Sequence, residues 1–193
     1  ALKTILTLKN LKIFTWLEQV ENSTELLLSL NSEFFNQDEI EKFKPIFYLV
    51  EIFNEKSLVK LKFSKSEIAD ANSLRKWKKK LLKISIEEFD DCERFDLHKE
   101  LESILPSFVF YLPSEIHPEW LHRWRNKKDK LFHPTNLVNG EILKQYIDIN
   151  DGPLLGDLLK YLSMELAFGR LHDFDESIYK AEQWFQQNAP KCD

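Results

Sequence analysis

The chain has 193 residues, of which 43% are hydrophobic and 13% aromatic, and its formal net charge is −5. This apolar content excludes an intrinsically disordered chain, and the length is sufficient for one or two compact domains. No apolar run reaches the roughly 20 residues of a membrane span, and the only cysteines are Cys92 and Cys192. We therefore expect a cytoplasmic protein with no membrane partner and no disulfide framework.

The positions of the glycines indicate the fold class, and the first residues indicate that the chain belongs to a longer one. All four glycines follow residue 139, which argues against a β fold rich in tight hairpins. We predict an all-α fold, with an irregular multi-helix body over residues 1–113 and a small helical tail domain over 114–193. The chain starts with Ala-Leu-Lys-Thr-Ile, without methionine or a signal-peptide layout, which indicates a cut inside a longer chain.

The body shows helical periodicity in several segments. Apolar residues recur at helical spacing over 13–20 and 40–50, and Pro45 is expected to kink the second helix. Ser64 followed by Glu67 forms a capping box, so a helix should begin there and run to Leu81. A further apolar stripe over 97–105 should stop at Pro106. These stripes are most simply explained as core.

Charge along the chain is sorted into blocks. Nine Lys or Arg residues lie between Lys60 and Lys83, against two acidic residues, and a second basic stretch covers His122 to Lys130. An acidic segment, Glu87 to Glu93, separates them. Basic blocks are where a phosphate backbone can bind, although a lysine-rich helix face can also be merely solvated. We expect Arg123 and Arg125 to face away from the inner side of their helix.

The last sixty residues predict a small, well-delimited helical domain. Asn139 can cap a short helix, Gly152 and Pro153 start the next one, and Gly169 ends it as a C′ glycine would. Asp173 with Glu176 then caps a final helix.

No complete active site can be assembled from these residues. Asp173 and Asp175 have the spacing of a carboxylate pair for metal ions, but capping explains them better. His117 and His122 lack the i,i+4 spacing of a shared metal site. We therefore predict no catalytic residue, no metal ligand and no cofactor within this sequence.

The segment Gly152 to Gly156 leaves two interpretations open. A helix N-terminus with adjacent glycines can receive a phosphate, and the same glycines can permit close helix packing. We favour packing at Gly156, because leucines surround it and Asp151 would repel an anion.

The C-terminal half contains a set of residues that resembles a known family. These residues are Trp124-Arg125, Asp129, His133-Pro134, Leu137-Val138-Asn139-Gly140 and Leu143, followed by Gly152-Pro153-Leu154-Leu155-Gly156-Asp157-Leu158-Leu159 and a glycine-terminated helix. Together they resemble the C-terminal part of the bacterial tRNA nucleotidyltransferase/poly(A) polymerase family, the class II CCA-adding enzymes. Leu61 to Ile68 resembles a helix start in the body of the same family. The segment Arg170 to Asp175 departs from the usual tail.

The resemblance implies a body and tail without a catalytic head. The parent protein would transfer CMP or AMP to RNA 3′ ends, using Mg²⁺ and CTP or ATP in a head domain absent from this sequence. The body and tail would hold the acceptor and T arm of tRNA through its backbone. The predicted RNA-binding residues are Arg75, Lys76, Lys78, Lys79, Lys80, Lys83, Arg123, Arg125, Lys127, Lys128 and Lys130. The predicted structural residues of the tail are Gly140, Gly152, Pro153, Gly156 and Gly169.

Two other functions remain open at this point. One is a helical protein–protein interaction module with no RNA or catalytic role, which the acidic segment and the negative net charge favour. The other is a helical hydrolase with a metal ion at His98 or His117. The sequence predicts no oligomeric state.

Overall fold

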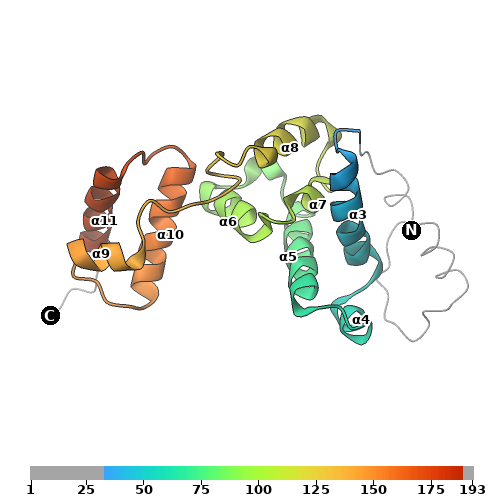
Figure 1. Cartoon of the computed structure of the whole chain (residues 1–193), viewed down its shortest axis with the longest axis horizontal. Coiled ribbons are helices and arrows are strands. Elements are labelled where there is room, and N and C mark those ends of the chain that lie inside the picture. The colour runs from blue at the N-terminus through green and yellow to red at the C-terminus, as the bar shows by residue number, and fades with distance from the viewer. Residues whose placement is uncertain (1–32, 189–193) are drawn as a thin grey trace, which may run out of the picture. The chain divides into compact units, whose positions relative to one another are not determined.

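The computed structural model describes residues 33–188, and these residues form helices joined by turns and loops (Figure 1). No β-strand occurs between residues 33 and 188, so the predicted all-α fold is confirmed for this part of the chain. The helix predicted over residues 13–20 lies outside it. The α-helices are α3 (Gln37–Ile52), α4 (Glu55–Lys60), α5 (Lys65–Leu81), α6 (Asp91–Leu101), α7 (Leu105–Val109), α8 (His117–Arg125), α9 (Gly140–Tyr146), α10 (Pro153–Ala167) and α11 (Phe174–Asn188). Two 3₁₀ turns, η1 (Ile86–Glu88) and η2 (Ser114–Ile116), complete the set.

The described chain divides into two compact units. The N-terminal unit contains residues 33–88 and 100–125, and the C-terminal unit contains residues 89–99 and 126–188. The chain passes between the units three times: between Glu88 and Phe89, inside α6, and after α8. Because the units are not separated by a single cut, they do not test the predicted division at residues 113 and 114, which stays a prediction.

The N-terminal unit is organised around α3, which packs against α5 and α7. Local capping fixes where the helices begin: Asn36 forms a capping box with Glu39 at the start of α3, and Ser64 forms the predicted one with Glu67 at the start of α5. Helix α3 continues through Pro45. The expected stop at Pro106 is wrong, because Pro106 lies in the first turn of α7, where its missing N–H costs no helical hydrogen bond.

The C-terminal unit has its core between α9, α10 and α11, and the predicted helix boundaries are confirmed there. Asn139 caps α9, and α10 ends at Ala167 with Gly169 as its C′ residue. The N–H groups of Gly169 and Arg170 donate to the carbonyls of Leu166 and Glu165. This is the Schellman arrangement, which satisfies carbonyls left open at a helix end. Asp173 caps α11, accepting from the N–H of Glu176 at 2.9 Å.

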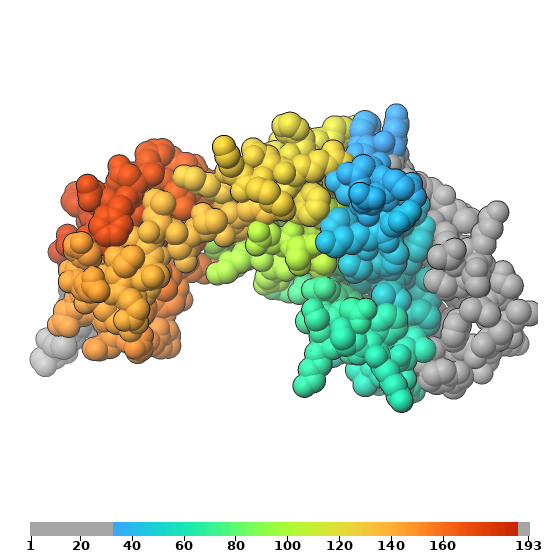
Figure 2. Space-filling view, viewed as in Figure 1, coloured from blue at the N-terminus to red at the C-terminus, as the bar shows by residue number. Residues whose placement is uncertain are grey.

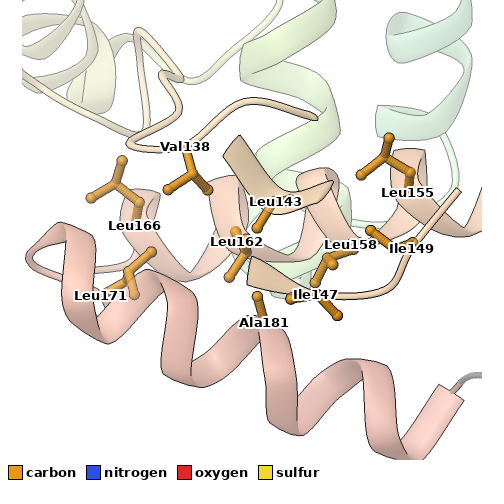
Figure 3. Packing of buried hydrophobic residues seen from close by; sticks show 10 residues of the cluster. All are labelled: Val138, Leu143, Ile147, Ile149, Leu155, Leu158, Leu162, Leu166, Leu171 and Ala181. Atoms are coloured by element: carbon orange, nitrogen blue, oxygen red, sulfur yellow. The ribbon is translucent and has the colours of Figure 1, made fainter. Parts of the chain in front are cut away.

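Buried aliphatic side chains from the three helices meet in this core (Figure 3). Leu158 and Leu162 of α10, Leu143 of α9 and Ala181 of α11 are almost fully buried. The space-filling view shows the side chains of these helices packed into one body (Figure 2). In residues 33–188, no helix combines the length and the apolar character that crossing a membrane requires.

Candidate nucleic-acid interface

The last turns of α5 carry the predicted lysine cluster. Ala71, Leu74 and Trp77 are the buried residues of this helix, and their spacing turns one stripe of α5 toward α3 and α7. Consecutive side chains of a helix point about 100° apart, so the lysines between these buried positions near the C-terminal end of α5 reach the surface. Lysines at this end also interact favourably with the negative pole of the helix dipole. These lysines can therefore stabilise α5 itself, even when no ligand is bound.

Four of the predicted residues come together in one place. Lys76, Lys79, Lys80 and Lys83, with Ile84, line a shallow hollow of about 460 Å³; we call these four lysines the basic surface. Lys79 and Lys83 are exposed and form no ion pair with any residue in the described part of the chain. Their ammonium groups are therefore available to an external anion.

The other two lysines of the basic surface are held by neighbours. Lys76 forms an ion pair with Glu100, whose other carboxylate oxygen accepts from the indole N–H of Trp77 at 2.8 Å. The ammonium groups of Lys76 and Lys80 lie 5.1 and 5.4 Å from the centre of the Trp77 ring. Trp77 and Glu100 thus restrict the two lysines that border the free pair.

Arg75 and Lys78, also predicted to contact RNA, have internal partners instead. The ammonium of Lys78 lies 2.6 Å from the buried carboxylate of Glu51, and the hydroxyl of Tyr111 donates to the same carboxylate at 2.7 Å. Burial, followed by the charge and hydrogen bond of Glu51, holds the pKa of Tyr111 well above its usual value. Arg75 donates to the carbonyl of Phe53, and burial lowers its pKa. These contacts leave the two cations less free to bind a phosphate.

The second basic stretch is divided between the two units. Arg123 and Arg125 belong to α8 in the N-terminal unit, whereas Lys127, Lys128 and Lys130 belong to the C-terminal unit. The side chains of Lys128 and Lys130 are exposed and form no ion pair within residues 33–188.

The prediction that Arg125 is turned away from the inner side of its helix is wrong. Its guanidinium makes two hydrogen bonds, of 2.7 and 2.6 Å, to the carboxylate of Glu39, which is buried in α3. Burial alone would raise the pKa of Glu39, but the bonds from Arg125 and from the Asn36 N–H outweigh it and lower the pKa. Burial of a charged group costs free energy unless the group is paired and hydrogen-bonded, as Glu39 is with Arg125. Arg125 therefore holds α8 on α3.

The tail glycines serve the backbone in different ways. Gly152 has φ 155° and ψ −172°, a conformation open essentially to glycine alone, and it caps α10 just before Pro153. Gly169 has φ 69° in the Schellman turn. Gly140 makes the close approach, since a Cβ there would lie 3.2 Å from Leu155 Cδ2.

The packing expected at Gly156 is absent. A Cβ at Gly156 would meet no atom within 4 Å, and the residue is exposed on α10. Leu155 and Leu158 do face the core, but Gly156 lies about 200° around the helix from Leu158 and points away from it.

In the described part of the chain, no group of three or more His, Cys, Asp or Glu side chains is placed so that it could hold a metal ion. The ring of His98 contacts that of Phe132 in a tilted arrangement, with ring centres 4.0 Å apart, and Nε2 of His117 lies 3.0 Å from the carbonyl of Leu112. Both histidines are buried in packing roles.

Comparison with known proteins gives one partial similarity. The chain is 31% identical over 91 residues to a CC-adding tRNA nucleotidyltransferase from Synechocystis sp., over 44% of this chain and 22% of the relative. No family model matches the chain, and no solved structure matches it. The chain therefore spans about a fifth of the length of this relative. The similarity supports relatedness to the tRNA nucleotidyltransferase family.

Proposed function

We propose that this chain is an RNA-positioning region of a tRNA nucleotidyltransferase and that the basic surface binds the sugar–phosphate backbone of tRNA. The observation that carries the proposal is the pair of free cations, Lys79 and Lys83, in a hollow bordered by Lys76 and Lys80. The relative that adds CC to tRNA supplies the class of RNA.

The chemistry of the basic surface suits recognition of a helical RNA arm by shape. The major groove of A-form RNA is too deep and narrow for side chains to read, so a protein holds such a helix through phosphates and 2′-hydroxyls. Lysine ammonium groups bind phosphates as point charges and carry no base preference. We therefore expect binding at the acceptor and T arm that is indifferent to sequence.

Catalysis would belong to another part of the parent protein. Transfer of CMP or AMP requires metal ions that neutralise the charge of the triphosphate, and the described residues bring no carboxylate cluster together for them. We propose that Mg²⁺ and CTP or ATP bind outside this sequence. Incubation of the chain with Mg²⁺, CTP, ATP and a tRNA that lacks its CCA end should give no extension of the RNA.

A salt titration of tRNA binding tests the proposal. If two to four phosphates are neutralised, the logarithm of the binding constant should fall with the logarithm of salt concentration with a slope of about −2 to −4. The double variant Lys79→Glu/Lys83→Glu should bind at least tenfold more weakly and show a shallower slope.

The chain offers a matched control at the other end of the same helix. Lys62 and Lys65 are exposed and unpaired within the described residues. They lie just before and at the start of α5, about 25 Å along this helix from its C-terminal end. Lys62→Glu/Lys65→Glu changes the net charge equally and should retain most of the affinity. Equal losses in the two double variants would show a response to overall charge and would contradict a site at the basic surface.

A further inference from the structure

The C-terminal unit combines exposed aromatic side chains with carboxylates that have no partner. Tyr146 of α9 and Phe174 of α11 are 54% and 37% exposed and meet edge to face, with ring centres 5.8 Å apart. Tyr179 is 60% exposed, and its hydroxyl accepts a hydrogen bond from Gln183 at 2.6 Å. Large aromatic groups left in solvent are typical of interaction sites.

The outward side of α11 continues this surface. Asp175, Tyr179 and Glu182 follow the i, i+4, i+7 spacing that places side chains along one face of a helix, and all three are exposed. The opposite face of α11 packs into the core through Ala181. We call Tyr146, Phe174, Asp175, Tyr179 and Glu182 the acidic aromatic surface.

The charges around this surface oppose a phosphate backbone. Residues 131–188 contain nine acidic and four basic side chains. Each of the four basic groups already forms an ion pair within the C-terminal unit; they are Lys144 with Glu141 and Asp151, Lys160 with Asp96, Arg170 with Asp91 and Glu165, and Lys180 with Glu165.

Carboxylates, by contrast, remain unpaired there. Asp148, Asp157, Asp175 and Glu182 form no ion pair with any residue between 33 and 188. A base stacked on Tyr146 or Phe174 would bring its phosphate close to Asp148 or Asp175, which are near neighbours of these aromatic residues in the sequence. Binding of RNA to aromatic side chains normally combines stacking with a positively charged groove.

We propose that the acidic aromatic surface is a docking site for a protein segment rich in Lys or Arg that also carries apolar side chains. Complementary charge steers such a segment to the surface and disfavours acidic competitors. The apolar side chains of the segment would cover Tyr146 and Phe174, and its cations would pair with Asp175 and Glu182. The site shares no residue with the basic surface, so this inference does not depend on the proposed RNA binding.

Fluorescence anisotropy with a labelled synthetic peptide tests the proposal on the whole chain. The probe is an amphipathic peptide of about 14 residues, with leucines at helical spacing and lysines elsewhere. Two variants remove the two properties of the surface separately: Tyr146→Ala/Phe174→Ala and Asp175→Lys/Glu182→Lys. We expect each to bind the peptide about tenfold more weakly than the unmodified chain. Thermal melts check that the variants fold, which the exposure of these side chains favours.

Glu115→Lys/Glu119→Lys is the matched control, because it makes the same charge change at exposed, unpaired carboxylates of the N-terminal unit. It should leave peptide binding unchanged. Absence of peptide binding by the unmodified chain, or an equal loss in the control, would overturn the proposal. Loss of tRNA affinity in Tyr146→Ala/Phe174→Ala would also overturn it, since the surface would then be a platform for RNA bases.

Discussion

The end of α5 and the helices α9–α11 treat their charged side chains in opposite ways. At the end of α5, Lys78 is paired with buried Glu51, while Lys79 and Lys83 stay free. In α9–α11, every basic group is paired and several carboxylates stay free. Net charge and charged blocks therefore do not locate a phosphate-binding surface. The pairing of individual side chains decides which charges remain available.

The difference follows from how the charges are spaced along the helices. Consecutive residues of a helix point about 100° apart, so a run such as Lys78, Lys79 and Lys80 cannot turn entirely toward one acidic partner. Lys78 reaches inward to Glu51, Lys80 lies over the ring of Trp77, and Lys79 reaches solvent. The basic residues of α10 and α11 occur singly, and each finds a carboxylate, as Lys180 does with Glu165 at 2.8 Å.

The largest effect that would sharpen this comparison is expected at Lys78. Lys78→Ala removes an ammonium group that lies 2.6 Å from the buried carboxylate of Glu51, which should lower the free energy of unfolding by about 3 kcal/mol. Lys79→Ala at the exposed neighbour should change it by less than about 0.5 kcal/mol. Urea unfolding of both variants measures the difference. Similar values for the two would contradict the division into internal and free lysines.

Two glycines of the tail should respond in opposite directions. Gly152→Ala forces a side chain into a backbone conformation reserved for glycine and should destabilise the chain by about 1–3 kcal/mol. Gly156→Ala adds a methyl group in open space within α10 and should stabilise it by up to about 1 kcal/mol. Thermal melts of the two variants, compared with the unmodified chain, test both signs. A destabilised Gly156→Ala would restore the packing interpretation.

A smaller, pH-dependent effect is expected at the Arg125–Glu39 pair. The pKa of Glu39 is lower in the folded chain, so its contribution to stability is present above the unfolded pKa of about 4.3 and is lost as pH falls through the folded value. Arg125→Gln should therefore destabilise the chain at pH 7, and the loss should shrink below pH of about 4.

Urea midpoints measured from pH 7 to pH 3 test this expectation. Lys128→Gln removes the same charge at an unpaired, exposed lysine and should follow the unmodified chain across that range. A deficit of Arg125→Gln that stays constant with pH would show that Arg125 contributes packing alone.

Local features of the fold could be predicted from the sequence because their partners are three to five residues apart. The capping box of Ser64 and Glu67, the cap at Asn139 and the turn at Gly169 all depend on such neighbours. The all-α class followed from helical periodicity and from the late position of the glycines.

Contacts between distant residues could not be predicted in the same way. Glu39 and Arg125 are 86 positions apart, and Glu51 and Lys78 are 27 apart, so no local pattern connects them. The direction of Gly156, in contrast, could have been predicted from the sequence. Two steps of 100° from Leu158 place Gly156 on the outer side of α10. The inference from neighbouring leucines ignored that direction.

Lysine footprinting with and without tRNA compares the two regions in one experiment and tests the central claim most directly. Each lysine is acetylated by a water-soluble ester, and mass spectrometry gives its reactivity with RNA relative to its reactivity without RNA. Contact with the phosphate backbone should protect Lys79 and Lys83, while Lys144, Lys160 and Lys180 of the C-terminal unit should react equally in both samples. Protection of those three lysines with Lys79 and Lys83 unchanged would contradict the account.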